Sequence, residues 1–215
     1  MRRTHTKQSL WRDTAAGEGL KPQLAMQELV ASQVFRIYAN FPITDHISWR
    51  VPGVAGQESW NTYILTSDTK AVIVDAGVGR GMTEYVSMLQ QVVGGRDVEL
   101  LVTTRLEPDC LANLDTVVAA LSPRTIYAPG GLDPLDFFED QNTSATLASM
   151  ADVSSFSVKR EEVVDTLGPD RRVRVAPSLL RTLPTLWLHD EANGIVFTSD
   201  TFSHVTRSHA PALDR

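Results

Sequence analysis

The chain has 215 residues, of which 42% are hydrophobic and 21% charged, a composition typical of a globular protein with room for one core. Its formal net charge of -6 at pH 7 excludes a general affinity for nucleic acid or anionic membranes, which requires an excess of positive charge. The only cysteine, Cys110, cannot form an intrachain disulfide, which favours a cytoplasmic protein.

Residues 1–22 are predicted to form a disordered basic tail, and residues 23–215 a single domain. The tail begins MRRTHTKQSLWR, which contains no Asp or Glu but lacks the apolar stretch of a secretion signal. No apolar run reaches the roughly 18 residues that cross a bilayer, so the sequence indicates no membrane segment.

The first half of the domain alternates between strand and helix patterns. Residues 21–42 are expected to hold a short helix and then a strand over residues 34–38. Two β-rich runs follow, NTYILTS and KAVIVDAG, with the polar turn SDTK between them. The second run is almost wholly apolar, as in a strand covered on both faces, and ends at Asp75.

Helices are predicted over residues 81–93 and 110–121 from apolar residues at helical spacing, and strands over the runs VELLVTT and RTIYAP. The resulting order from residue 61 to residue 128 is ββαβαβ, which predicts a layered α/β fold with a partly parallel sheet.

The second half is richer in strand signals. Residues 133–164 mix weak helix and strand patterns, and three strand candidates follow in RVRVAPSLLRTL, TLWLHD and GIVFTSD. The segment DEANG between the last two is typical of a turn. Two strand-rich halves, each with helices, suit two sheets packed face to face with helices outside.

Four segments together resemble the metallo-β-lactamase fold superfamily: NTYIL, AVIVDAG, LLVTTRLEPDCLANL and PTLWLHDEANGIVFTSDTF. Within it, the chain looks closest to the flavodiiron and oxygen-binding diiron branch. The first metal motif of that branch is His-x-Glu-x-Asp, of which RLEPD keeps the Glu, the Pro and the Asp. The resemblance covers about residues 45 to 205 and implies a four-layer αβ/βα sandwich, C-terminally short.

The resemblance also assigns positions to the metal ligands. Glu107 and Asp109 take the places of two iron ligands, and Asp200 that of the carboxylate that bridges the metals. Arg105 takes the place of the first histidine. Asp75 takes the place of a structural acceptor that braces the metal-binding loop.

The remaining ligand positions also lack histidine. Thr182, beside Arg181, takes the place of the second histidine, and the final one would lie beyond Arg215. His204, which follows SDTFS, is the histidine nearest the candidate site in the sequence and is a further candidate ligand.

The change of ligands alters the expected chemistry. Imidazole holds iron or zinc at neutral pH, whereas carboxylates alone suit magnesium, calcium or manganese. A guanidinium stays protonated and cannot bind a metal. We therefore expect Arg105, with Arg181, to form an ion-pair cluster with Glu107, Asp109 and Asp200 in place of the metals.

Three of these residues have other interpretations. Asp109 fits the N-cap of a helix that begins at Leu111, and Glu107 fits a surface turn residue. Cys110 takes a position that holds a second-metal ligand in other branches of the fold. A lone cysteine is nevertheless more often a small buried residue than a nucleophile.

Three functions are consistent with the sequence. The first is a metal-free descendant of the diiron domain, without a cofactor, that acts as a binding or assembly module through a protein partner or as a homo-oligomer. The second is a diiron-type oxidoreductase, or an oxygen- or nitric-oxide-binding protein, that holds iron or manganese with exchanged ligands. The third is a metal-independent enzyme in which Arg105 and Arg181 bind a small anionic substrate beside carboxylates that act as acid and base, with Cys110 as a less favoured nucleophile. An active enzyme of this fold would be an oxidoreductase or a hydrolase.

Overall fold

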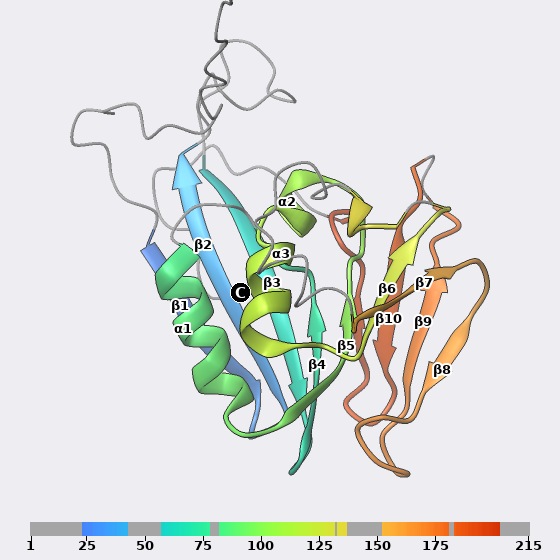
Figure 1. Cartoon of the computed structure of the whole chain (residues 1–215), viewed down its shortest axis with the longest axis horizontal. Helices are drawn as coiled ribbons and strands as arrows, with labels where there is room; N and C mark the ends of the chain where they lie inside the picture. The colour runs from blue at the N-terminus through green and yellow to red at the C-terminus, as the bar shows by residue number, and fades with distance from the viewer. Residues whose placement is uncertain are drawn as a thin grey trace, which may run out of the picture.

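The structure is a computed structural model that describes residues 23–42, 57–77, 82–131, 133–136, 152–180 and 183–202. Within these ranges the strands form two sheets (Figure 1). The larger sheet has seven strands in the order β1-β2-β3-β4-β5-β6-β7, and the smaller has four in the order β11-β10-β9-β8. The predicted tail, residues 1–22, lies outside the described residues.

The strands and helices of the first part of the chain are β1 (Gln23–Val30), β2 (Val34–Pro42), β3 (Gln57–Thr66), β4 (Lys70–Val74), α1 (Met82–Val93), β5 (Asp97–Val102), α2 (Pro108–Leu111), α3 (Leu114–Leu121), β6 (Thr125–Pro129) and β7 (Ser154–Val158). The smaller sheet consists of β8 (Glu162–Val164), β9 (Val173–Pro177), β10 (Leu186–Asp190) and β11 (Ile195–Phe197).

The predicted order ββαβαβ is confirmed by the strands β3 to β6 and their helices. β3 and β4 form the expected antiparallel hairpin, while β4, β5, β6 and β7 run parallel. Parallel strands place their carboxyl ends at one edge of the sheet, so the loops that follow β4 and β5 meet there.

The helix expected before residue 34 is wrong, because residues 23–30 form strand β1. β1 pairs antiparallel with β2 from Gln23 opposite Asn40 to Val30 opposite Val34. Leu, Ala, Met, Gln and Glu favour helix locally, but pairing with the nine-residue strand β2 overrides that weak preference.

The single helix predicted over residues 110–121 is also wrong, because it is two helices. Asn113 leaves the helical conformation, with φ of -107° and ψ of 10°, between α2 and α3. Leu111 and Leu114, on either side of the break, are both buried, and neither exposes more than 4% of its surface. The apolar spacing that predicted one helix persists across the break, which is why the sequence pattern did not reveal it.

Strand alternation divides the core between the two faces of the larger sheet. Ala71 and Ile73 of β4 pack with α1 and α3, whereas Val72 and Val74 pack against the smaller sheet. The apolar run in β4 therefore belongs to a strand covered on both faces, as predicted.

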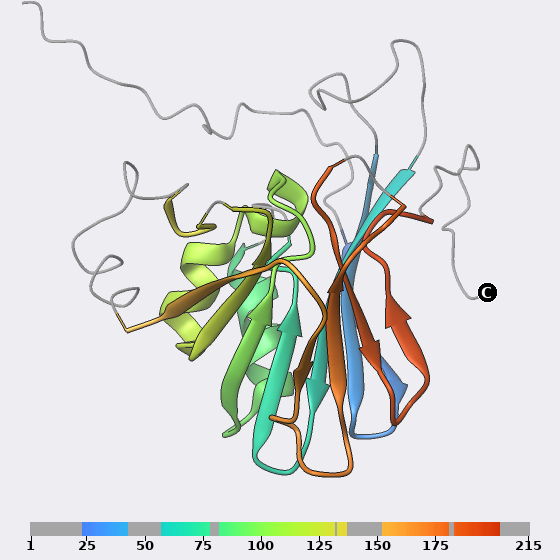
Figure 2. The same cartoon turned by 90° about the vertical axis from the view of Figure 1, so that its right-hand side faces the viewer.

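The chain is an α/β sandwich, as the sequence predicted, with α1 and α3 outside the larger sheet (Figure 2). The smaller sheet packs on the opposite face, so the described ranges show a helix layer and two sheet layers. None of the helices in these ranges is long and apolar enough to cross a membrane.

Candidate functional site

The candidate residues meet at one end of the sandwich, the upper end in Figures 1 and 2, where β4, β5 and β11 end. Asp75 follows β4, Arg105 follows β5, and Ser199 and Asp200 follow β11. Asp75 and Ser199 have φ of 64° and 55°, in the left-handed region. Backbone held in this region by non-glycine residues often accompanies a site.

Arg105 lies at the centre of this end, and its side chain is only 6% exposed. Its Nη1 donates to Glu107 Oε2 at 2.5 Å and lies 3.0 Å from Asp200 Oδ2. Its Nη2 donates to Asp109. The ion pairs predicted between Arg105 and these carboxylates are thus present, and we call the four residues the Arg105 cluster.

Helix α2 positions two of the carboxylates. Glu107 is the N-cap residue, with extended backbone and no side-chain capping bond, and Pro108 begins the helix. Asp109 lies in the first turn, so its interpretation as an N-cap is wrong. The turn from extended to helical backbone brings both carboxylates to the same guanidinium.

Among the described residues, the carboxylates of Glu107, Asp109 and Asp200 surround one guanidinium. Burial opposes the charge of Arg105, but the field of Cys110 and of these carboxylates outweighs it and raises the pKa of the guanidinium. Arg105 therefore remains a cation at any pH at which the protein is folded.

Asp75 holds the loop that carries Arg105. Its Oδ1 accepts from the Thr104 backbone N–H at 2.6 Å, and its Oδ2 accepts from the Thr104 hydroxyl at 2.8 Å. Burial raises the pKa of Asp75 from 3.8 to about 7, even though both bonds from Thr104 oppose the rise. These contacts are those of a structural acceptor.

The sequence analysis missed Thr104 and Ser199. Ser199 Oγ accepts from Arg105 Nε at 2.9 Å and lies 2.8 Å from the oxygen of the Thr104 hydroxyl. The two hydroxyls thus connect Asp75 to Arg105 across the two sheets. Their only sequence signal is position, since each directly precedes a candidate residue, Arg105 or Asp200.

Cys110 is 3% exposed and lies 3.6 Å from Thr104 Oγ1 through its Sγ. Burial raises the pKa of its thiol well above the usual value, and the charges of Asp75 and Asp109 raise it further. A nucleophilic thiolate requires the opposite environment, exposed and electropositive. Cys110 is placed here as a small buried core residue.

Arg181, Thr182 and His204, the remaining candidates, lie outside the described residues. Among the residues that the structure describes, no group of three or more His, Cys, Asp and Glu side chains is placed to hold a metal ion. The available oxygens surround a guanidinium, and a cation at their centre excludes a second one by repulsion. The described donor set therefore does not fit iron or zinc.

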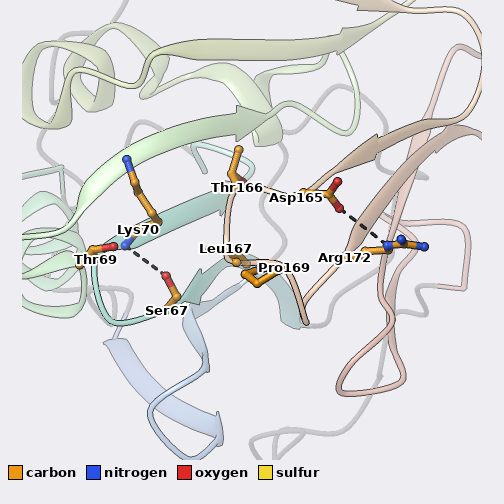
Figure 3. A pocket seen from close by; sticks show the side chains of 9 residues that line it. Ser67, Thr69, Lys70, Asp165, Thr166, Leu167, Pro169 and Arg172 are labelled. Carbon is orange, nitrogen blue, oxygen red and sulfur yellow. Dashed lines mark hydrogen bonds and ion pairs between the residues drawn. The ribbon is translucent and has the colours of Figure 1, made fainter.

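Two shallow depressions lie at the other end of the sandwich, by the turn between β3 and β4. Their volumes are about 610 and 500 Å³. Figure 3 shows the larger one, in which Asp165 and Arg172 pair at its border and Lys70 lies on its wall. No candidate site residue lines either depression.

Comparison with family models finds no match, and comparison with curated proteins finds none either. Solved structures do share the fold. A fragment of diflavin flavoprotein A 5 from Nostoc sp. PCC 7120 is 16% identical with a TM-score of 0.60, over 83% of this chain and 67% of the fragment.

A variant of the flavo di-iron protein from Thermotoga maritima is also 16% identical with a TM-score of 0.60, over 84% of this chain and 42% of that protein. A metallo-β-lactamase from Pontibacter korlensis is 18% identical with a TM-score of 0.55, over 82% of this chain and 71% of the lactamase. This chain therefore has the metallo-β-lactamase fold, and it spans less than half of the Thermotoga protein. At such identities the likeness establishes the fold alone.

Proposed function

We propose that the protein is a metal-free module for binding or assembly, built on the fold of a diiron domain. The proposal rests on the position of Arg105, whose guanidinium contacts Glu107, Asp109 and Asp200 together. By resemblance these are the carboxylates that would hold metal. The permanently charged guanidinium of Arg105 would neutralise these carboxylates in place of a metal.

Displacing Arg105 to admit a metal would be costly. Its Nε and both terminal nitrogens have partners, and its side chain is only 6% exposed. A metal would have to compensate for the lost ion pairs and for the burial of an unpaired guanidinium. This free-energy cost of displacing Arg105 supports a site without metal.

An enzyme that binds an anionic substrate through Arg105 has less support. The nitrogens that would grip the anion already donate to Ser199, Glu107 and Asp109. The excess of carboxylates would repel an anion, and the thiol of Cys110 is buried. These contacts favour a binding role over catalysis at this end.

Elemental analysis tests the proposal. The purified chain is incubated separately with iron, manganese and zinc, dialysed and analysed beside an Asp200→Ala variant. We expect no stoichiometric metal in either protein. Stoichiometric metal that is lost in Asp200→Ala would overturn the proposal and favour the diiron-type oxidoreductase or oxygen-binding alternative.

A matched variant tests whether the site can bind metal once the guanidinium is removed. Arg105→His removes the permanent cation and adds an imidazole beside Glu107, Asp109 and Asp200. We expect this variant to retain manganese or zinc that the unchanged chain does not retain. If neither protein retains metal, the guanidinium is not what excludes it.

A further inference from the structure

Four strands lie at the edges of the two sheets, and β1 differs from the other three in length. β1 has eight residues, whereas β7, β8 and β11 have five, three and three. In the described ranges no strand pairs with the outer side of β1, which lies at the end of the larger sheet beside α1 (Figure 1). A long edge strand offers a row of backbone N–H and C=O groups to another strand.

The hairpin with β2 gives β1 a regular backbone before any partner arrives. The register with β2 is unbroken over residues 23–27, and its irregularity lies beyond them, between Glu28 and Val30. Arg36 Nη2 donates to Gln27 Oε1 at 2.7 Å and ties the two strands together. Residues 23–27 are therefore preformed for pairing.

Two common protections of an edge strand are absent from residues 23–27. Their sequence, QLAMQ, contains no charged residue and no proline. Charged residues, lysine above all, and proline are the residues that natural proteins place on edges to prevent pairing. The net charge of -6 opposes association of the chain with itself in general, but none of that charge lies in this stretch.

We propose that β1 pairs antiparallel with β1 of a second copy, around a two-fold axis at Ala25, so that the two larger sheets become continuous. This register places Ala25 opposite Ala25 and Leu24 opposite Met26 of the second copy. Gln23 comes opposite Gln27, so no charged residue enters the pair. Opposite residues of an antiparallel pair lie on the same face, and apolar residues here meet apolar ones.

Neighbouring registers are less favourable. A shift that centres the pair on Met26 places Leu24 opposite Glu28 of the second copy, a carboxylate beside an apolar side chain. A shift that centres the pair on Leu24 leaves only the first three residues of β1 to pair. The strand complements itself best around Ala25, which favours a second copy over an unrelated segment.

Leu24 links this edge to the core. It packs, partly buried, against the core cluster on the helix side of the larger sheet. Met26 lies two residues further along, on the same face, and is 41% exposed. In the proposed pair, Met26 of each copy covers Leu24 of the other and loses exposed apolar surface.

Sedimentation velocity of the full chain tests the inference. We expect a reversible dimer of twice the 23.7 kDa mass of one chain, whose share grows with protein concentration. Ala25→Lys places like charges opposite each other at the axis and should raise the dissociation constant at least about tenfold. Val163→Lys is the matched control, because it adds the same charge to the edge strand β8, where Val163 is 46% exposed, and it should leave the dimer intact.

A mixture of two variants tests the register itself. Ala25→Asp alone should weaken the dimer as Ala25→Lys does. An equal mixture of the two variants should form a dimer again, because lysine of one copy then lies opposite aspartate of the other. Circular dichroism confirms that each variant is folded, and recovery in the mixture excludes misfolding as the cause of the loss.

Three results would overturn the inference. These are a monomer at every concentration, a dimer that Ala25→Lys leaves intact, or mixed variants that stay monomeric. The second result would assign the dimer to another surface. β1 contains no residue of the Arg105 cluster, so metal in the elemental analysis defeats the proposed function alone, and a monomeric chain defeats this inference alone.

Discussion

Two buried arginines join the sheets at opposite ends of the sandwich, and their surroundings differ. Arg171 pairs with Asp190, which is fully buried, at 2.7 Å, and donates to the backbone carbonyls of Thr66 and Gln33 at 2.6 and 3.2 Å. One carboxylate balances one guanidinium there. Arg105 instead meets the partly exposed carboxylates of its cluster, which outnumber it.

The two buried aspartates differ in the same way. Burial opposes ionisation of Asp190, but hydrogen bonds and charge from Arg171, with Asn193, outweigh burial and lower its pKa. Asp75 has bonds from Thr104 but, among the described residues, none from an arginine, and burial raises its pKa to about 7. Among the described residues, one end pairs a single carboxylate with a single guanidinium inside the protein, whereas the other places three partly exposed carboxylates around one guanidinium.

Arg171→Ala should produce the largest loss of stability. It leaves Asp190 buried without its cation and two backbone carbonyls without a donor, which costs about 3–5 kcal/mol of the free energy of unfolding. Urea denaturation measures the loss. Arg172→Ala is the control, because Arg172 is 58% exposed and its ion pair spans 3.9 Å, and it should cost at most about 0.5 kcal/mol. If both variants lost the same free energy of unfolding, the buried ion pair of Arg171 would not stabilise the fold.

The Asp75→Asn variant tests the Arg105 end of the sandwich through the dependence of stability on pH. The carboxyl titrates near 3.8 when unfolded and about 7 when folded, so between these values the folded chain holds a proton that the unfolded chain lacks. Its contribution to stability therefore falls as pH rises from about 4 to 7 and is constant above. In asparagine, Oδ1 can still accept from the Thr104 N–H, Nδ2 would donate to the Thr104 hydroxyl in place of the present bond, and the residue tolerates the φ of 64°.

The variant should consequently gain about 4 kcal/mol relative to the unchanged chain between pH 4 and pH 8. Urea denaturation of both proteins across this range gives the difference directly. Parallel stability curves would mean that Asp75 is ionised throughout, and the contrast with Asp190 would disappear.

Arg105→Met should cost less than the loss of Arg171, about 2 kcal/mol, because partly exposed carboxylates remain hydrated when their cation is removed. Denaturation at pH 7 measures it beside Arg105→Lys, which keeps the charge but not the planar set of donors. We expect the lysine variant to recover part of the loss. If Arg105→Met lowers the free energy of unfolding as much as Arg171→Ala does, the Arg105 cluster mainly stabilises the fold, as the Arg171 pair does.

The sequence predicted most of this architecture because strong local patterns decided it. The hairpin of β3 and β4, the parallel order of β4 to β6 and the sandwich follow from apolar runs, turns and helical spacing. β1 was missed because its residues favour helix locally and the strand depends on its partner β2. The sequence of one strand alone does not indicate that it will pair with a particular partner strand.

The Arg105 cluster was predicted because the resemblance to the diiron branch assigned Glu107, Asp109 and Asp200 to one site with Arg105 in place of a histidine. Thr104 and Ser199 were missed because a hydroxyl has no spacing signature, and their contact spans 95 residues of chain. The Arg171 support was missed for a similar reason. Two of its acceptors are backbone carbonyls, 105 and 138 residues away, which no side-chain pattern identifies.

Glu107→Gln should have the smallest effect, within about 0.5 kcal/mol, since the side chain is 38% exposed and the cluster retains two carboxylates for its guanidinium. The same isosteric change in the Arg171 pair, Asp190→Asn, removes the negative charge that balances the buried guanidinium of Arg171. It should therefore lower the free energy of unfolding strongly. Urea denaturation of the two variants compares them directly. If Glu107→Gln proves as harmful as Asp190→Asn, the negative charge at the Arg105 end is required for folding. If it is neutral, folding does not require the charge of Glu107.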